Sequence, residues 1–146
     1  MRRPRLTIGL ALFLPLLTGA APPPPDGAII VDVSGIRSDK GMVRVSVCPR
    51  PNFLGDCPWF ASVPARIGAV SVTVPDVPPG RYAVQAFHDA DSDGKLQRYW
   101  FGLPREGIGF SNDAMAHITY PRFSVAAFDH AAVAQQVAVT VRYFLR

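Results

Sequence analysis

The residues best suited to chemistry form a short acidic run, HDADSDG, at positions 88–94. Three carboxylates stand at alternate positions and a glycine follows at once, which is the first half of an EF-hand calcium loop, D-x-D-x-D-G. Calcium takes six to eight oxygen ligands, and alternate aspartates in a tight turn can point at one centre. Gly94 permits the sharp turn required there. The pattern therefore predicts a calcium ion bound by Asp89, Asp91 and Asp93.

Beyond the glycine, the match to a calcium loop is only partial. Lys95 would offer its backbone carbonyl, but Trp100 occupies the position of the bidentate glutamate of an EF-hand. No helical pattern flanks the run, so we expect a half-loop on a strand-to-strand connection. If no further side chain supplies a ligand, water completes the shell and the affinity should be as weak as at extracellular sites. Four side chains are candidates for a missing ligand: Gln97, Glu106, Asn112 and Asp113.

Electrostatic repulsion gives a second reason to expect a cation. Three carboxylates within five residues repel one another, so without an ion one of them would take up a proton or the loop would open. Lys95 and Arg98 offset this repulsion only in part. The alternative is an ordinary polar turn, in which the aspartates accept hydrogen bonds from the backbone and no ion is bound.

A glycine-rich stretch, Trp100–Asn112, follows the acidic run and shows no strand alternation. Loops of this length are either functional or packed by their own side chains. Its aromatic and polar groups predict a site for a sugar or a peptide end. The candidate ligand-binding residues are Trp100, Phe101, Phe110, Ser111 and Asn112. The alternative is that the aromatic rings fold back and cover one edge of the domain.

The two cysteines, Cys48 and Cys57, lie close together in the sequence. An even, close pair in an oxidising compartment predicts a disulfide. A redox or metal-binding pair is the other interpretation, but the Cys-x-x-Cys spacing and a neighbouring histidine are both missing.

The composition predicts that strands position these groups. The chain has one Glu and two Lys, which are the residues that usually cover exposed helix faces. Valine alternates with polar residues at 42–47, 70–74 and 137–143, which is the period of a strand with one buried face. Further strands are expected at 28–34 and 81–87, and a weaker one at 122–128. We therefore predict an all-β, two-sheet antiparallel sandwich of immunoglobulin-like architecture, with a small β-barrel as the alternative.

The first twenty residues have the three parts of a secretory signal: three arginines, an apolar run from Leu6 to Leu17, and small residues before a cleavage site. The apolar run is too short to span a bilayer, although an uncleaved anchor is the alternative. We expect a signal peptide at 1–20, a proline-rich spacer at 21–27 and one domain at 28–146. The mature chain would have no transmembrane segment and would be periplasmic or secreted.

Removal of the signal changes the charge balance. Three of the 15 basic residues would leave with it, so 12 basic side chains would face 11 acidic ones, a net charge of +1. This balance gives no basic patch, and we expect no nucleic-acid partner.

From Val74 onward the chain resembles the bacterial domain-of-unknown-function family 2141. The resemblance rests on an ordered series of short stretches: PGRYAV at 79–84, FHD at 87–89, GKL at 94–96, FGLP at 101–104, EG at 106–107, GFSN at 109–112, PRF at 121–123 and AF at 127–128. It implies an exported β-sandwich of transthyretin-like type and no established activity. Members often carry Asn where this chain has Asp91 and Asp93, so the extra charge favours a cation here.

The sequence therefore predicts a non-catalytic, calcium-binding domain that binds a glycan, a peptide or a cell-envelope protein. One alternative is a purely structural module without an ion. A second is a periplasmic hydrolase, because the transthyretin-like fold includes one. The Tyr-Arg-Gly-Ser ending of that enzyme is absent, and a triad of Ser111, His88 and Asp113 has no support in its spacing.

Overall fold

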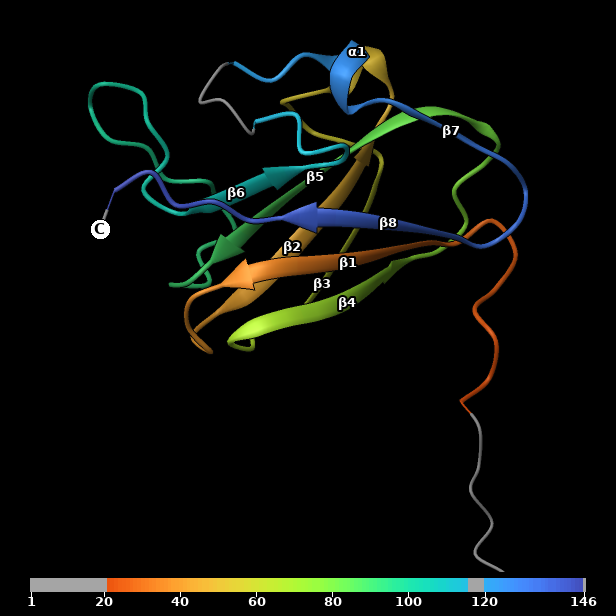
Figure 1. Ribbon diagram of the computed structural model, residues 1–146, viewed down its shortest axis with the longest axis horizontal. Helices are drawn as coiled ribbons and strands as arrows, with labels where there is room; N and C mark the ends of the chain where they lie inside the picture. Colours follow the sequence, from red (N-terminus) through yellow and green to blue (C-terminus); the bar gives the residue numbers. More distant parts are fainter. Residues whose placement is uncertain (1–20, 116–119, 146) are drawn as a thin grey trace, which may run out of the picture.

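The computed structural model describes residues 21–115 and 120–145, and nearly all regular structure there is β (Figure 1). The expected signal at 1–20 lies outside the described residues. The strands are β1 (Ile29–Ile36), β2 (Met42–Cys48), β3 (Trp59–Pro64), β4 (Gly68–Val74), β5 (Gly80–Asp89), β6 (Gly107–Phe110), β7 (Phe128–His130) and β8 (Gln135–Thr140). A 3-10 turn, η1 (Arg50–Asn52), and one helical turn, α1 (Phe123–Ala126), complete the elements.

The strands form two packed sheets, which confirms the all-β sandwich. One sheet has the order β4-β1-β8, and the other has the order β3-β2-β5-β6 with β7 paired to β5. In Figure 1 the three-stranded sheet lies across the front of the other. The β1–β8 pair differs from the antiparallel expectation, because it is parallel and joins Ile29 to Gln135. Most of the domain separates these strands, so no hairpin fixes their relative direction.

The alternating valines explain the core between the sheets. Val43, Val45 and Val47 of β2 are fully buried, as are Val31 and Val33 of β1. The polar residues between them face outward, as the period of two predicts.

Two strands and one helical turn were not expected. The strand β3 was not predicted, and β6 falls inside the stretch expected to be a loop. A Cβ on Gly109 of β6 would collide with the carbonyl of Thr140, so the close crossing with β8 requires glycine there. That requirement removes the alternation by which a strand is recognised.

The strand expected at residues 122–128 is wrong. The chain forms α1 and then the short β7 instead. Phe123 and Ala126 both pack into a second apolar cluster, and their spacing of three residues suits one helical turn rather than a strand. This second cluster also contains Ala83, Ile108 and Phe110, and it covers part of the outer face of the five-stranded sheet.

The disulfide between Cys48 and Cys57 is confirmed. It joins the end of β2 to the segment just before β3. The loop it closes is bonded to β5, because the Leu54 N–H donates to Gln85 Oε1 at 3.1 Å and Gln85 Nε2 donates to the Gly55 carbonyl at 3.1 Å.

We predict that replacing both cysteines by alanine lowers the free energy of unfolding by about 2–3 kcal/mol, the loop-closure entropy of a ring of this size. Urea denaturation of the oxidised protein and the double variant measures the difference. An equal stability in both proteins would mean that the bonds between this loop and Gln85, rather than the disulfide, close the loop.

Candidate metal centre

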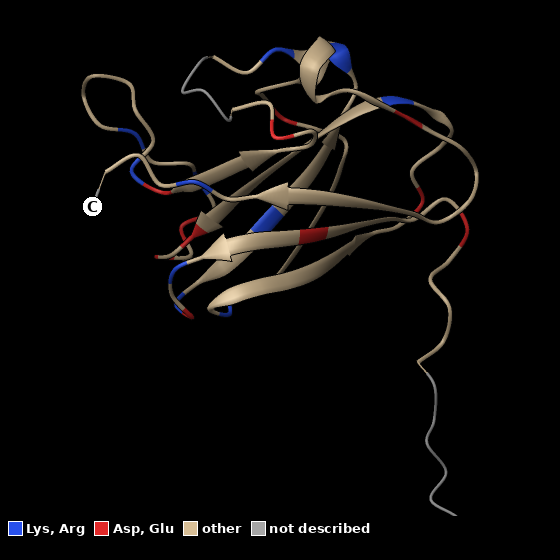
Figure 2. Cartoon of the chain, viewed as in Figure 1, with Lys and Arg blue, Asp and Glu red and all other residues tan. Residues whose placement is uncertain are grey.

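Asp89 ends β5 and is completely buried. Its Oδ2 accepts hydrogen bonds from Arg44 Nε at 2.5 Å and from the Gly94 N–H at 3.0 Å. Its Oδ1 accepts from the Asp93 N–H at 3.1 Å. Figure 2 shows the acidic segment at the end of β5, beside a basic segment in β2. One carboxylate thus joins β2, β5 and the turn that follows.

The pKa of Asp89 lies below its ordinary value. Burial by itself would raise it, but the Arg44 guanidinium and the backbone N–H groups of Gly94 and Asp93 together outweigh burial. Asp89 is therefore an ionised, structurally bonded carboxylate at neutral pH.

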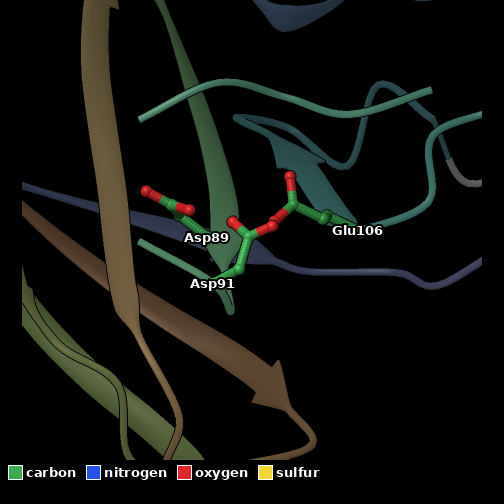
Figure 3. A group of neighbouring side chains, drawn as sticks. All are labelled: Asp89, Asp91 and Glu106. Atoms are coloured by element: carbon green, nitrogen blue, oxygen red, sulfur yellow. The ribbon is translucent and has the colours of Figure 1, made fainter. Parts of the chain in front are cut away.

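Asp91 and Glu106 lie next to Asp89, although Asp91 and Glu106 are fifteen positions apart in the chain (Figure 3). One oxygen from each of the three carboxylates lies within 4.8 Å of the other two. Glu106 directly precedes β6, so the pairing of β5 with β6 brings it to the acidic turn. Of the four candidates for a missing ligand, Glu106 is the one that the fold places in this cluster.

Asp93 lies outside this group of three carboxylates. Its Oδ1 accepts the Lys95 N–H at 2.7 Å, and its Oδ2 accepts from Gln97 Nε2 at 3.1 Å. Gln97 also donates to Asp91 Oδ2 at 2.7 Å. The regular spacing of the three aspartates therefore does not direct all three side chains at one centre, because Asp93 closes the turn.

Burial raises the pKa of Glu106 above its ordinary value, and the charges of Asp89 and Asp91 raise it further. The N–H groups of Gln97 and Ala90, which donate to the two Glu106 oxygens, oppose this shift in part. A raised pKa means that protonation of Glu106 stabilises the folded cluster.

The other two ligand candidates have different partners. Asn112 Nδ2 donates to the carbonyls of Val125 and Ala127, at 3.1 and 3.0 Å. Asp113 forms an ion pair with Arg142 at 2.6 Å. Both residues therefore hold the segment after β6 in place.

The five residues predicted to bind a sugar or a peptide do not form one surface. Trp100 is 95% exposed and Phe101 is 48% exposed, at the end of the loop that precedes β6. Phe110 and Ser111 are buried, and Asn112 holds the segment just described. The expectation that the aromatic rings fold back is met by Phe110 and fails for Trp100.

The side chains of the imagined hydrolase triad each have other partners. The Ser111 hydroxyl donates to the Ala126 carbonyl at 2.6 Å and accepts the Val84 N–H at 2.9 Å. His88 is bonded through Nδ1 to the Tyr143 hydroxyl at 2.7 Å and through Nε2 to the Lys40 carbonyl at 2.8 Å. These contacts leave no geometry for proton transfer from Ser111 to His88.

Comparison with known proteins adds a family. Residues 31–138 match the family described as an uncharacterized protein conserved in bacteria, DUF2141. No curated protein and no solved structure matches the chain significantly. Among the described residues, no helix combines the length and the apolar character needed to cross a membrane.

We predict that Asp89→Asn destabilises the protein at pH 7 by about 3 kcal/mol, because it leaves Arg44 without its charge partner. The folded-state pKa of Asp89 is lowered, so its contribution is present above the unfolded pKa and is lost as the pH falls. The difference from the wild type should therefore shrink below about pH 4. Urea denaturation across pH 3–7 measures it.

Asp129→Asn is the matched control, because it breaks the Arg81–Asp129 pair, whose side chains are 56% and 80% exposed. We expect a loss of less than about 1 kcal/mol in that variant. Equal losses in the two variants would contradict a special role for the buried pair.

Proposed function

The chain belongs to the bacterial DUF2141 family, as the resemblance predicted, and we propose that it is an exported, non-catalytic β-sandwich whose acidic turn binds calcium. In this proposal the domain binds a ligand or a partner in the cell envelope, and the ion fixes the turn beside the binding surface.

The observation that carries the ion proposal is the convergence of Asp89, Asp91 and Glu106 within 4.8 Å. The three carboxylates come from two separate segments, and within the described part of the chain a single guanidinium, that of Arg44, forms an ion pair with one of them. Carboxylate oxygens at this spacing are ligands that calcium prefers, and backbone carbonyls and water would fill the remaining positions. Burial is the main cause of the raised pKa of Glu106, and a divalent ion would offset the repulsion that Asp89 and Asp91 add to it.

Two features support export. Residues 1–20 have the basic, apolar and small-residue parts of a secretory signal. The Cys48–Cys57 disulfide suits an oxidising compartment, because reduced thiols prevail in the cytosol.

We predict that 10 mM calcium raises the melting temperature, relative to EGTA, by about 5 °C, as expected for a dissociation constant near 1 mM. Asp91→Asn should abolish the rise, because Asp91 belongs to the carboxylate cluster. Asp93→Asn should keep most of it, because the Asp93 carboxylate bonds the turn instead. Thermal melts of the wild type and both variants give the comparison.

Asp32→Asn, which neutralises an exposed carboxylate on β1, is the control for a general charge effect. It should retain the full calcium response. No rise in the wild-type protein, or an equal rise in Asp91→Asn, would leave the acidic turn as a hydrogen-bonded turn without an ion.

We also predict cleavage after Ala20. Expression of the full chain in a bacterium should yield a periplasmic product that begins at Ala21, as N-terminal sequencing would show. Leu12→Arg, which interrupts the apolar run, should leave the chain uncleaved in the cytoplasm. A cleaved product of the variant would contradict the proposed signal.

A further inference from the structure

The outer face of the five-stranded sheet carries a cleft of about 950 Å³. Members of the second apolar cluster, including Phe87, Leu96 and Phe110, form part of the lining of this cleft. The sheet register sets its floor in two rows: Ser62, Arg44 and Phe87 in one, and Phe60, Ser46 and Gln85 in the other. The disulfide loop borders one end and the segment from Gly94 to Pro104 borders the other.

The long polar side chains of the floor are already bonded within the protein. Arg44 is paired with Asp89, and Gln85 is bonded to Leu54 and Gly55 of the disulfide loop. These internal bonds occupy part of the hydrogen-bonding capacity that each group could offer to the hydroxyls of a sugar. The floor therefore offers an occupant mainly the faces of its apolar side chains.

Two of the apolar side chains along the cleft are exposed. Phe60 is 72% exposed on β3, and Leu54 is 36% exposed on the disulfide loop. Phe87, Leu96 and Leu103 are half-buried along the same cleft. Contiguous exposed apolar groups in a concave surface indicate a binding site for an apolar ligand.

The charged residues that line the cleft at the end opposite the disulfide loop are basic, although the acidic turn directly precedes Lys95 in the chain. Lys95 and Arg98 line it there with exposed side chains, and neither forms an ion pair within the described residues. The acidic lining residue is Asp56, on the disulfide loop at the other end. An occupant that places an apolar body against Phe60 and an anion near Arg98 would satisfy both features.

We propose that this cleft binds a single-chain amphiphile with an anionic head, of the class of long-chain carboxylates. The volume is in the range of small-molecule sites, about 300–1,000 Å³. The inference rests on the ligand-binding part of the proposed function, whose ligand class it names, and is independent of the ion.

The test is a titration of the mature chain with dodecanoate below its micelle concentration, in EGTA because calcium precipitates long-chain carboxylates. Calorimetry gives the affinity, and ¹⁵N chemical shifts locate the site. We expect saturable binding with shifts centred on Ser46, Phe60 and Phe87. Dodecyltrimethylammonium, with the same chain and the opposite charge, should bind at least about tenfold more weakly.

Two variants test the two halves of the ligand. Phe60→Ser should weaken dodecanoate binding about tenfold by removing apolar contact. Arg98→Glu should weaken it about fivefold or more by reversing the charge near the head. Ile67→Ser and Arg66→Glu, on exposed residues outside the cleft, are the matched controls and should bind like the wild type.

Equal binding of the cationic and anionic amphiphiles, shifts centred away from β2 and β3, or binding of a neutral oligosaccharide or a peptide at this face in place of dodecanoate would overturn the inference. The calcium melt is read separately. A calcium response without dodecanoate binding would contradict only the proposed cleft ligand. Dodecanoate binding without a calcium response would contradict only the proposed ion site.

Discussion

Asp89 is a buried carboxylate whose charge is balanced by the guanidinium of Arg44 on the neighbouring strand. A buried charge is tolerated only when it is paired and hydrogen-bonded. The Asp89 carboxylate accepts hydrogen bonds from three donors. The pair joins β2 to the end of β5, and the remaining donors close the acidic turn. Gly41, at a positive φ of 72°, lets the β1–β2 turn lie against the same backbone, where a Cβ would collide with the Asp89 carbonyl.

The Asp89–Arg44 pair, which anchors the acidic turn, lies beside a carboxylate with the opposite pKa shift. Asp89 is stabilised in its ionised form, whereas Glu106 is destabilised in its ionised form by burial and by the nearby aspartates. The two shifts have opposite effects on stability as the pH falls, since protonation weakens the Asp89 contacts and relieves the Glu106 repulsion. A cation at Asp91 and Glu106 would relieve the same repulsion without breaking the Arg44 pair.

The anchor also connects the turn to the cleft. Arg44 lies in the floor of the cleft and bonds Asp89, and the segment that runs from Gly94 to Pro104 borders one end. Order in the turn therefore fixes the position of Lys95 and Leu96 along the cleft. The backbone hydrogen bonds between Ile108 and Arg142 hold β6 to the chain after β8, and they fix the position of Ile108 beside the cleft.

Local pattern alone determined the all-β class, most strands, the disulfide and the acidic turn. The alternation of valines marks the buried face of a strand whose other face is exposed to solvent. The cysteine spacing is local in the chain. By contrast, β6 escaped prediction because its glycines serve a crossing with β8 that no local pattern records. The turn at Phe123 escaped because a second cluster, assembled from distant segments, decided its conformation.

The candidate ion site divides in the same way. Asp89 and Asp91 were readable from their spacing, but only the β5–β6 pairing selected Glu106 over Asn112 and Asp113. The spacing also predicted Asp93 as a ligand, but in the folded turn its carboxylate accepts the backbone N–H of Lys95. The sequence by itself determined which residue types are available. The tertiary structure decided which of them meet, because strand pairing brings together groups that are distant in the chain.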